Sequence, residues 1–414
     1  MTTTTRSFAL RVGGAAACLM VAACTAGPTG SGPAAVPLPT TPSPSVPLTP
    51  SPSAVATPEG IGRITYGVDV NVFDRDIGLG RVPTVLSLAN QIGAGAVRIG
   101  LDWQDAEPRP ASYDWNRLDR LLALARANRL TVLLELGEEP SWDAPGGNRA
   151  APPRDCATPQ ASCAVVRAFV GALVAHAAPL GLHYLVVRNE PQDFAKNWDG
   201  GTASDYAHYQ QVVYQAAHEA DPTILVLNGG TEDAPQLSGE ARALGLSGSY
   251  GAKAAVFAQA LYSDPNWCRS LDVLDLHVAD HGPVYSPEIV RESSAALLRC
   301  DGNVPKPIWI TECAYSALPA VQDSPTVQAE LGRTYVGGEQ GQARYLADVF
   351  NALSAVPGVV GINWTFLVDP NATTPPAGSS ERLVAGAGDG LFDAELHPRP
   401  AAAAFHAIAR GGHP

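Results

Sequence analysis

GAVRIGL (95–101), WNRLDRLLALARAN (115–128) and LTVLLEL (130–136) form the stretch of sequence that decides the fold. The first and third segments are almost continuously apolar, which is typical of strands that are buried on both faces of a sheet. The segment between them is amphipathic and long enough for a helix. A strand, a helix and a second strand in this order predict two parallel strands joined by a helical crossover.

The same alternation continues on both sides of this unit, with further helix-like segments at 161–178, 204–220, 252–262 and 339–355. Eight repeats at this length predict a (β/α)8 barrel that forms a single domain over residues 61–414. A doubly wound open sheet is the competing arrangement, but FDRDIG (73–78) after the first strand is not a glycine-rich phosphate loop. The strand-like runs are 65–71, 95–101, 130–136, 183–188, 223–228, 271–277, 307–311 and 358–366.

The composition is that of an acidic globular protein. The 414 residues include 27 Lys or Arg and 40 Asp or Glu, which gives a formal net charge of −13, and 46% of the residues are hydrophobic. This composition allows a large core and excludes disorder for most of the chain. Because no run of basic residues is longer than a pair, nucleic acid is not an expected partner.

The N-terminus has the features of an export signal. Arg6 and Arg11 flank an apolar run over 13–23 that is too short to span a bilayer. The run ends in VAAC, which resembles a bacterial lipobox, so residues 1–23 are predicted to be removed and Cys24 to carry lipid. A plain secretory peptide is the alternative. Residues 24–60 are rich in Pro, Ser and Thr and predict a disordered tether. The expected location is extracellular, either anchored to the membrane only through lipid or secreted.

Cysteine usage agrees with export. An oxidising compartment favours disulfides between Cys156 and Cys163 and between Cys268 and Cys300, which leaves Cys313 over. No CxxC motif or Cys/His pair has the spacing of a zinc site. The sequence therefore gives no reason to expect a metal or another cofactor.

Catalytic residues of such barrels follow the C-terminal ends of the strands. Glu190 in VVRNEP and Glu312 in PIWITEC stand out, because a carboxylate set in apolar strand sequence is costly to bury without a function or a partner. A structural ion pair with an arginine is the alternative interpretation of each. The candidates at strand ends are Asp102-Trp103, Glu135 to Glu139, Asn189-Glu190, His277, Glu312 and Trp364.

These motifs resemble those of clan A glycoside hydrolases. Asn189-Glu190-Pro191 is similar to the acid/base signature of that clan, and Ile310-Thr311-Glu312 is similar to its nucleophile signature. Three βα units fit between the two motifs, as in the clan, and the similarity extends over about residues 65–410. The other matching positions are Arg98 on strand 2, Trp103, Tyr113-Asp114-Trp115 before the next helix, and Trp364 on strand 8.

The resemblance implies a retaining glycosidase that acts on a polysaccharide or an oligosaccharide. Such enzymes use one carboxyl group to protonate the leaving oxygen and a second, about 5–5.5 Å away, to attack the anomeric carbon. Glu190 would be the acid and then the base, and Glu312 the nucleophile. Arg98 would keep Glu312 ionised and Asn189 would bind a sugar hydroxyl. The other expected substrate-binding residues are His277, Trp103, Trp142 and Trp364, with Trp364 as an apolar floor and Trp198 as a possible further subsite.

Side-chain alternation along strands adds two expectations. Asn189 and Glu190 can both reach one site only if the strand breaks there, and Pro191 predicts such a break. Counting back from Glu312 predicts that Trp309 packs against the helices.

The sequence departs from the clan on strand 6. Members carry His-x-Tyr, whereas this chain has His277 followed by Ala279, so Tyr285, His281 or Tyr315 is a candidate replacement. A carbohydrate-binding lipoprotein without activity is therefore an alternative, as is transglycosylation by the same residues. A metal pair of His277 and His281 lacks a third ligand. Glu138 and Glu139 in GEEPSW are rival acids, but neither follows an asparagine. The loops 192–204, 231–251 and 314–338 predict an elaborated cleft.

Overall fold

The computed structural model describes residues 64–70, 79–192, 197–231, 252–279, 282–318, 335, 338–370 and 388–411. The expected signal peptide, tether and lipidated Cys24 lie outside these residues. Among the described residues, no helix has the length and apolar content needed to cross a membrane.

Eight parallel strands form one sheet. They are β1 (Thr65–Asp69), β2 (Ala96–Leu101), β3 (Thr131–Leu136), β4 (Tyr184–Val186), β5 (Leu225–Leu227), β6 (Leu274–His277), β7 (Ile308–Glu312) and β8 (Val359–Trp364). Their order is β5-β4-β3-β2-β1-β8-β7-β6, so β1 lies between β2 and β8. Isolated bridges from Leu227 to Val273 and from Thr231 to Leu276 join β5 to β6. The chain is therefore a (β/α)8 barrel rather than an open sheet, and the predicted fold class is confirmed.

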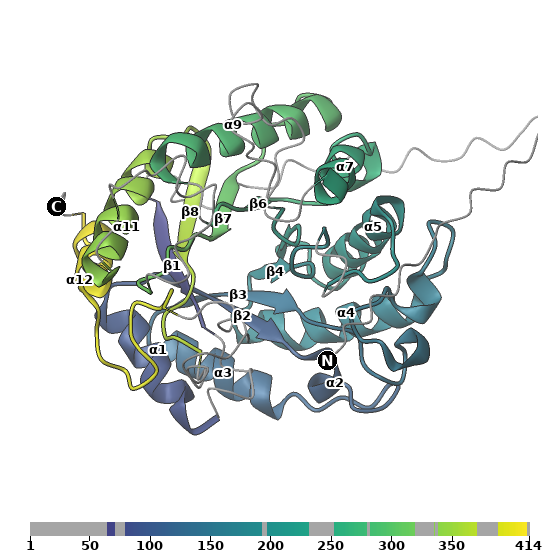
Figure 1. Ribbon diagram of the computed structural model, residues 1–414. Coiled ribbons are helices and arrows are strands. Elements are labelled where there is room, and N and C mark those ends of the chain that lie inside the picture. The colour runs from purple at the N-terminus through teal and green to yellow at the C-terminus, as the bar shows by residue number, and fades with distance from the viewer. Residues whose placement is uncertain are drawn as a thin grey trace, which may run out of the picture. The chain divides into compact units, whose positions relative to one another are not determined.

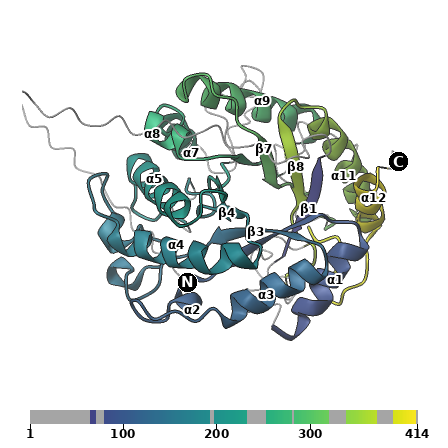
Figure 2. The same ribbon diagram turned by 180° about the vertical axis from the view of Figure 1, so that it is seen from behind.

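Helices surround the strands in both views of the ribbon (Figures 1 and 2). The α-helices are α1 (Val82–Gln91), α2 (Trp103–Ala106), α3 (Asn116–Ala127), α4 (Ala164–Ala177), α5 (Ala203–Ala220), α7 (Ala252–Leu261), α8 (Pro265–Arg269), α9 (Gly282–Cys300), α11 (Gly338–Ser354) and α12 (Pro400–Ala409). Short 3-10 helices are η1 (Leu79–Arg81), η2 (Pro145–Gly147), η3 (Arg154–Cys156) and η4 (Ala178–Leu180).

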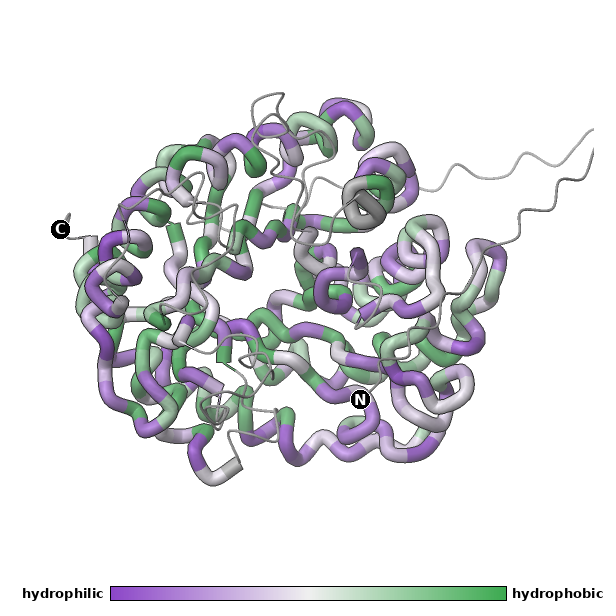
Figure 3. The backbone as a smooth tube through the Cα atoms, viewed as in Figure 1, coloured by the Kyte–Doolittle hydropathy of each residue, from purple (hydrophilic) through white to green (hydrophobic). Residues whose placement is uncertain are grey.

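The main core lies between the strands and the helices. In α3, the residues Leu118, Leu121, Leu122 and Ala125 are buried, which is the spacing of one helical face. Hydrophobic residues recur along the strands, and the helices alternate hydrophobic and hydrophilic residues (Figure 3). Burying one such leucine contributes roughly 1.5–3 kcal/mol, so this interface accounts for much of the stability of the barrel.

The inside of the barrel contains two layers of different character. The apolar layer consists of Ala96, Leu133, Val186, Leu227, Val273 and Trp309. The next inward-facing positions toward the C-terminal ends of the strands are polar, and they include Asp69, Arg98, Glu135, Asp275, Thr311 and Asn363. The apolar layer fills the barrel below the polar layer. The polar layer lies at the C-terminal end of the barrel, where barrel enzymes carry their active sites.

Trp309 contradicts the sequence-based prediction, since it lies inside the barrel and not against the helices. Its Nε1 donates to Asn363 Oδ1 at 3.0 Å, and its ring occupies the space beside Gly361. The pairing of β6 with β7 shifts between Leu276↔Ile310 and His277↔Glu312. This bulge lets consecutive residues at the end of β7 face the same side, so counting by twos from Glu312 assigned the wrong face to Trp309.

Two disulfides are present, Cys156–Cys163 and Cys268–Cys300, and they are the two pairs that the sequence favoured. The first joins η3 to the residue that precedes α4. The second joins α8 to the end of α9. Cys313 is buried directly after β7.

Candidate active site

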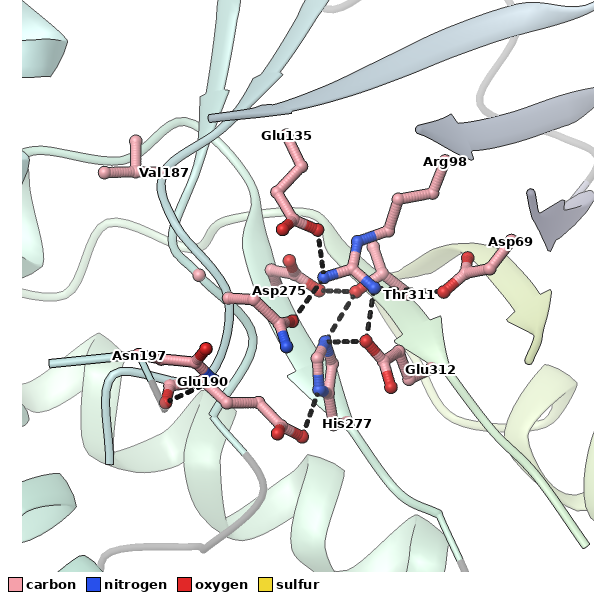
Figure 4. A network of polar contacts seen from close by, with 12 residues as sticks. Asp69, Arg98, Glu135, Val187, Glu190, Asn197, Asp275, His277, Thr311 and Glu312 are labelled. Carbon is pink, nitrogen blue, oxygen red and sulfur yellow. Dashed lines mark hydrogen bonds and ion pairs between the residues drawn. The ribbon is translucent and has the colours of Figure 1, made fainter. Parts of the chain in front are cut away.

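Glu190 and Glu312 converge on His277 at the C-terminal end of the barrel (Figure 4). His277 Nδ1 lies 2.8 Å from Glu190 Oε1, and His277 Nε2 lies 3.6 Å from Glu312 Oε1. One carboxylate oxygen from each glutamate and a nitrogen of His277 all lie within 4.8 Å of one another. The carboxylate side chains are 13% and 19% exposed, whereas His277 is fully buried. The two carboxylates therefore share one partly open site.

The backbone after β4 allows Asn189 and Glu190 to reach this site together. The strand ends at Val186, and both Arg188 (φ 69°) and Glu190 (φ 37°) are left-handed. The expected break is thus present, but it starts before Pro191. The Glu190 amide donates to the Gly229 carbonyl at 2.6 Å and fixes the turn against the end of β5. Left-handed conformations of larger residues are strained and concentrate at functional sites.

Arg98 is the positive centre of the polar layer. Its guanidinium donates to Asp69 Oδ2 at 3.0 Å and contacts Glu312 Oε1. It also lies 2.6 Å from Glu135 Oε2 and donates to Asn189 Oδ1 at 2.5 Å. With its side chain 5% exposed, this one cation links groups from β1, β3, β7 and the turn after β4.

The charges around Glu312 favour its ionised form. Burial opposes ionisation, but the charges of His277 and Arg98 outweigh it and lower the pKa of Glu312 below its usual value. Burial also opposes protonation of His277, yet Glu312 and the hydrogen bond with Glu190 raise the pKa of His277 to about 9. At neutral pH the site therefore combines an ionised Glu312 with a protonated His277.

Burial raises the pKa of three further acids of the polar layer above their usual values. Burial raises the pKa of Asp69 to about 7, against the attraction of Arg98. Burial raises the pKa of Asp275 to about 6, against His277 and Arg98, and it also raises the pKa of Glu135. The two cations, Arg98 and His277, are thus outnumbered by the carboxyl groups around them. Removal of either cation would leave buried negative charge without compensation.

Two glycines after β5 hold both halves of the site in contact. A Cβ on Gly229 would lie 2.5 Å from the Val187 carbonyl oxygen, and a Cβ on Gly230 would lie 2.0 Å from His277 Nε2. Gly230 also has a left-handed backbone with φ 59°. The close approach of β5 to the imidazole therefore requires glycine.

Gly230→Ala should lower the free energy of unfolding by about 2–4 kcal/mol, because the methyl group must displace the buried His277 ring. Gly146→Ala is a matched control, since Gly146 has φ 61° but a Cβ there meets nothing within 4 Å. The control should cost about 1 kcal/mol from backbone strain alone. Chemical denaturation of both variants measures the difference, and equal losses would show that contact with His277 contributes nothing.

Trp364 and Trp103 do not join the site, contrary to the sequence-based expectation. Trp364 is fully buried, with ring centroids 6.2 Å from both Tyr345 and Phe350 of α11. Trp103 is 2% exposed and stacks on Phe169 of α4 at 4.3 Å. Both indoles pack between the strands and the helices, so neither provides a surface for a sugar.

Two other tryptophans lie in the loops after β3 and β4. Trp142 is half-buried, and its Nε1 donates to the Glu107 carbonyl at 2.9 Å. Trp198 is fully buried beside the Arg188 guanidinium, 5.5 Å from the ring centroid. Of these two, Trp142 has the exposed surface that contact with a sugar requires.

The rival acids have other surroundings. Glu139 is fully buried and bonds Arg188 at 3.0 Å, and burial raises its pKa to about 8 against the charge of Arg188. Glu138 is 52% exposed and lies 3.7 Å from Arg149. Glu139 thus links the loop after β3 to the turn after β4, and it does not face a cleft.

Of the candidate replacements for the strand 6 tyrosine, one packs against α11, one lies on α9 and one lies outside the described residues. Tyr315 is buried and stacks on Tyr345 at 4.6 Å. Tyr285 lies on α9, half-buried, and His281 lies outside the described residues. The Glu312 side chain contacts Arg98 and His277.

Asp69, Asp275, Thr311 and Gly230 belong to the site but were not singled out from the sequence. The available signal was a polar residue on alternate positions of an apolar strand, as in YGVDV (66–70) and LDVLDLH (271–277). For Gly230 the signal was the pair of glycines that follows TILVLN (223–228).

The side chains could also bring a cation to Glu190, His277 and Glu312, since their donor atoms are close together. However, Arg98 already contacts the Glu312 carboxylate. A divalent ion and a buried guanidinium would repel each other there. The arrangement therefore suits nucleophilic and proton-transfer chemistry better than metal binding.

Comparison with known proteins gives matches only at the level of structure. No protein-family model and no curated protein sequence matches this chain. A family 39 glycoside hydrolase from the gut symbiont Bacteroides cellulosilyticus WH2 matches with a TM-score of 0.57 and 16% identity, over 83% of this chain and 63% of that one. The exo-beta-1,4-mannosidase Op5Man5 from Opitutaceae bacterium strain TAV5 matches with a TM-score of 0.54 and 18% identity, over 84% and 59%.

A third match is a GH5_18 protein from Streptomyces cattleya, determined in complex with Manb1-4GlcNAc. Its TM-score is 0.59 at 16% identity, over 84% of this chain and 80% of that one. The chain spans less than two thirds of the length of the first two proteins. At these identities the matches establish that the chain shares the barrel fold of glycoside hydrolases.

Proposed function

We propose that the protein is a retaining glycoside hydrolase in which Glu190 is the acid/base and Glu312 the nucleophile. The observation that carries this proposal is the approach of the two carboxylates to within 4.8 Å between one oxygen of each. Retaining enzymes hold their carboxyl groups about 5–5.5 Å apart, whereas inverting enzymes need about 6.5–9.5 Å to admit a water. The spacing thus favours double displacement over single displacement.

In the first step Glu312 attacks the anomeric carbon while Glu190 gives its proton to the leaving oxygen. The products are an ester between the sugar and Glu312 and a free alcohol. Glu190, now a carboxylate, removes a proton from water, and the resulting hydroxide attacks the anomeric carbon from the opposite side. Glu312 leaves as a carboxylate, and the sugar keeps its original anomeric configuration.

The surrounding side chains support these roles. Arg98 and His277 favour the ionised form of Glu312, which the first step requires. Arg98 donates a hydrogen bond to Asn189 Oδ1. The Nδ2 of Asn189 can therefore donate to a sugar hydroxyl. Trp142 is proposed as a subsite wall on the basis of its half-exposed indole.

The substrate is proposed to be a polysaccharide or an oligosaccharide. The structural matches include an exo-beta-1,4-mannosidase and a protein bound to Manb1-4GlcNAc, which supports a sugar ligand for the barrel. The polar layer presents carboxylates and an amide at its mouth and so offers hydrogen-bond acceptors and a donor to hydroxyl groups.

Trapping of the covalent intermediate tests the proposal. The probes are a panel of 2-deoxy-2-fluoro dinitrophenyl glycosides. The fluorine slows both steps, whereas the dinitrophenyl leaving group speeds the first, so the glycosyl ester should accumulate. Intact-mass measurement should show one added sugar, and peptide mapping should locate it on Glu312. Binding of sugars without labelling by any member of the panel would favour the alternative, a carbohydrate-binding protein without activity.

We further propose that the protein is exported and anchored through lipid on Cys24. The short apolar run, the VAAC sequence and the proline-rich segment support this proposal, and the two disulfides fit an oxidising compartment. Cys24→Ser should move the protein from the membrane fraction to the medium, and an unchanged distribution would contradict the anchor.

A further inference from the structure

We propose that Asp275 and Thr311 are positioning residues that act through His277 on Glu190, by fixing which imidazole nitrogen exchanges a proton with it. The inference rests on the proposed function for its catalytic consequence. Its structural part concerns the protonation of His277 and can be tested without any turnover.

Four side chains form a continuous hydrogen-bonded chain (Figure 4). Glu190 Oε1 lies 2.8 Å from His277 Nδ1, and His277 Nε2 lies 3.1 Å from Thr311 Oγ1. The Thr311 hydroxyl donates to Asp275 Oδ1 at 2.5 Å. Both Asp275 and Thr311 are fully buried, so the chain runs from the partly open Glu190 into the closed interior of the barrel.

The chemistry of Thr311 fixes the direction of this chain. A hydroxyl has one proton, and an ionised carboxylate can only accept, so the Thr311 proton points to Asp275. Thr311 Oγ1 must then accept from His277, which places a proton on Nε2. Nδ1 is left as the nitrogen that gains or loses a proton, and it faces Glu190. One proton is therefore shared between His277 Nδ1 and Glu190 Oε1.

Thr311 is the hydrogen-bond partner of the Asp275 side chain. Its Oδ2 has no hydrogen-bond partner among the described residues. The seam between β5 and β6 uses its backbone, because Asn228 Nδ2 donates to the Asp275 carbonyl at 2.9 Å and the Asp275 amide donates to Asn228 Oδ1 at 2.8 Å. A change of carboxylate to amide at Asp275 therefore leaves this seam intact.

The other charges around His277 come from several strands. Glu190 follows β4, Glu312 ends β7, Glu135 lies on β3, and Arg98 on β2 is the opposing cation. The end of β5 contributes the uncharged Gly230 against the ring. Glu312 and Glu190 raise the pKa of His277 to about 9 against the effect of burial. Asp275 is the acid of this group that is fully buried and bonded to Thr311, so its charge can be removed with little change at the mouth of the site.

Nitrogen-15 NMR of labelled histidine tests the structural part. In the wild-type protein the neutral form of His277 should carry its proton on Nε2. Asp275→Asn should lower the titration midpoint of His277 by about one pH unit, since a nearby negative charge is lost. Thr311→Val should remove the preference for the Nε2 proton, and Thr311→Ser should restore it. Asp119→Asn, at the 2.6 Å contact with His176 on the outer helices, should leave the midpoint of His277 unchanged.

The pH profile of kcat/KM tests the catalytic part. In Asp275→Asn the shared proton is held less tightly, so the alkaline limb should move to lower pH by a similar amount. A purely structural role would lower kcat without moving the limb. The inference would be overturned if folded Asp275→Asn kept the wild-type titration midpoint of His277 and folded Thr311→Val kept the wild-type tautomer. Its catalytic part would be overturned if the midpoint moved and the alkaline limb of kcat/KM did not. If the protein cleaves no glycoside, the NMR result still stands and only the proposed function fails.

Discussion

Replacing Glu312 with Gln should lower kcat/KM on an aryl glycoside by about 10⁴-fold or more, because an amide cannot attack the anomeric carbon. The loss should not depend on the leaving group, since attack by Glu312 is needed for every substrate. Gln preserves the size of the side chain, and circular dichroism and thermal unfolding would establish that the variant is folded. Release of nitrophenol under single-turnover conditions measures the effect.

Replacing Glu190 with Gln should give a different pattern. A poor leaving group needs a proton from Glu190, so its cleavage should slow by about 10²–10⁴-fold. A dinitrophenol leaving group needs little protonation and should still be expelled, after which the glycosyl ester accumulates because no base activates water. In Glu190→Ala, azide should occupy the vacated space and release a glycosyl azide of retained configuration.

Glu138→Gln is the matched control for both variants. Glu138 belongs to the loop after β3, is 52% exposed and contacts Arg149 rather than His277. The kcat/KM of Glu138→Gln should stay within a factor of about two of the wild-type value, as expected for a surface change. Near-normal turnover in Glu312→Gln, or the same loss for every leaving group in Glu190→Gln, would contradict the assigned roles.

The sequence was sufficient for the fold because its signal is repeated and local. Each apolar run and each amphipathic segment is readable alone, and eight of them in alternation leave few arrangements. Glu190 and Glu312 could be located for the same reason, since both stand at the ends of such runs. The observed β4 and β5 are shorter than the predicted 183–188 and 223–228, because the chain leaves the sheet to form the turns that reach the site.

Side-chain direction could not be predicted with the same success. The alternation rule holds only while a strand is regular. The register shift between Ile310 and Glu312 breaks the alternation, so counting back from Glu312 gave the wrong face for Trp309, whose ring lies inside the barrel. Trp364 and Trp103 have the residue type of a sugar platform, but their rings face helices. Neither a bulge nor the partner of an aromatic ring is encoded in the spacing of a single segment.

The interior network depends on contacts between residues far apart in the sequence. Asp69 and Asp275 each interrupt an apolar run by one residue, and nothing local shows that their neighbours are Arg98 and Thr311. The need for glycine at Gly230 follows from its contact with His277 on the next strand. These features became visible only once the strands were placed side by side.

Replacing Arg98 with Met should both destabilise the protein and change the pH dependence of activity. The change leaves Asp69, Glu135 and Glu312 without the cation that they share, and removal of one partner from a buried ion pair costs about 3–5 kcal/mol. The pKa of Glu312 should rise because an attraction that lowers it is lost. The acidic limb of kcat/KM, which requires ionised Glu312, should therefore move to higher pH by about one to two units.

The stability of the Arg98→Met variant should depend on pH with a definite sign. Burial already raises the pKa of Asp69 above its unfolded value of 3.8, and loss of Arg98 raises it further. A carboxyl with a raised folded pKa contributes stability that is complete below the unfolded pKa and is lost as pH rises through the folded pKa. The deficit of the variant in chemical denaturation should therefore be larger at pH 8 than at pH 5.

Arg399→Met is the control for Arg98→Met, because it removes a buried arginine that lies outside the site. Arg399 is 8% exposed and pairs with Asp369 and Glu339 at the start of α12. Its replacement should lower the melting temperature while the acidic limb stays where it is in the wild type. Arg98→Lys retains the charge and should keep most of the limb position even if Arg98→Met folds poorly. An acidic limb that does not move in folded Arg98→Met would show that Glu312 is kept ionised by His277 alone.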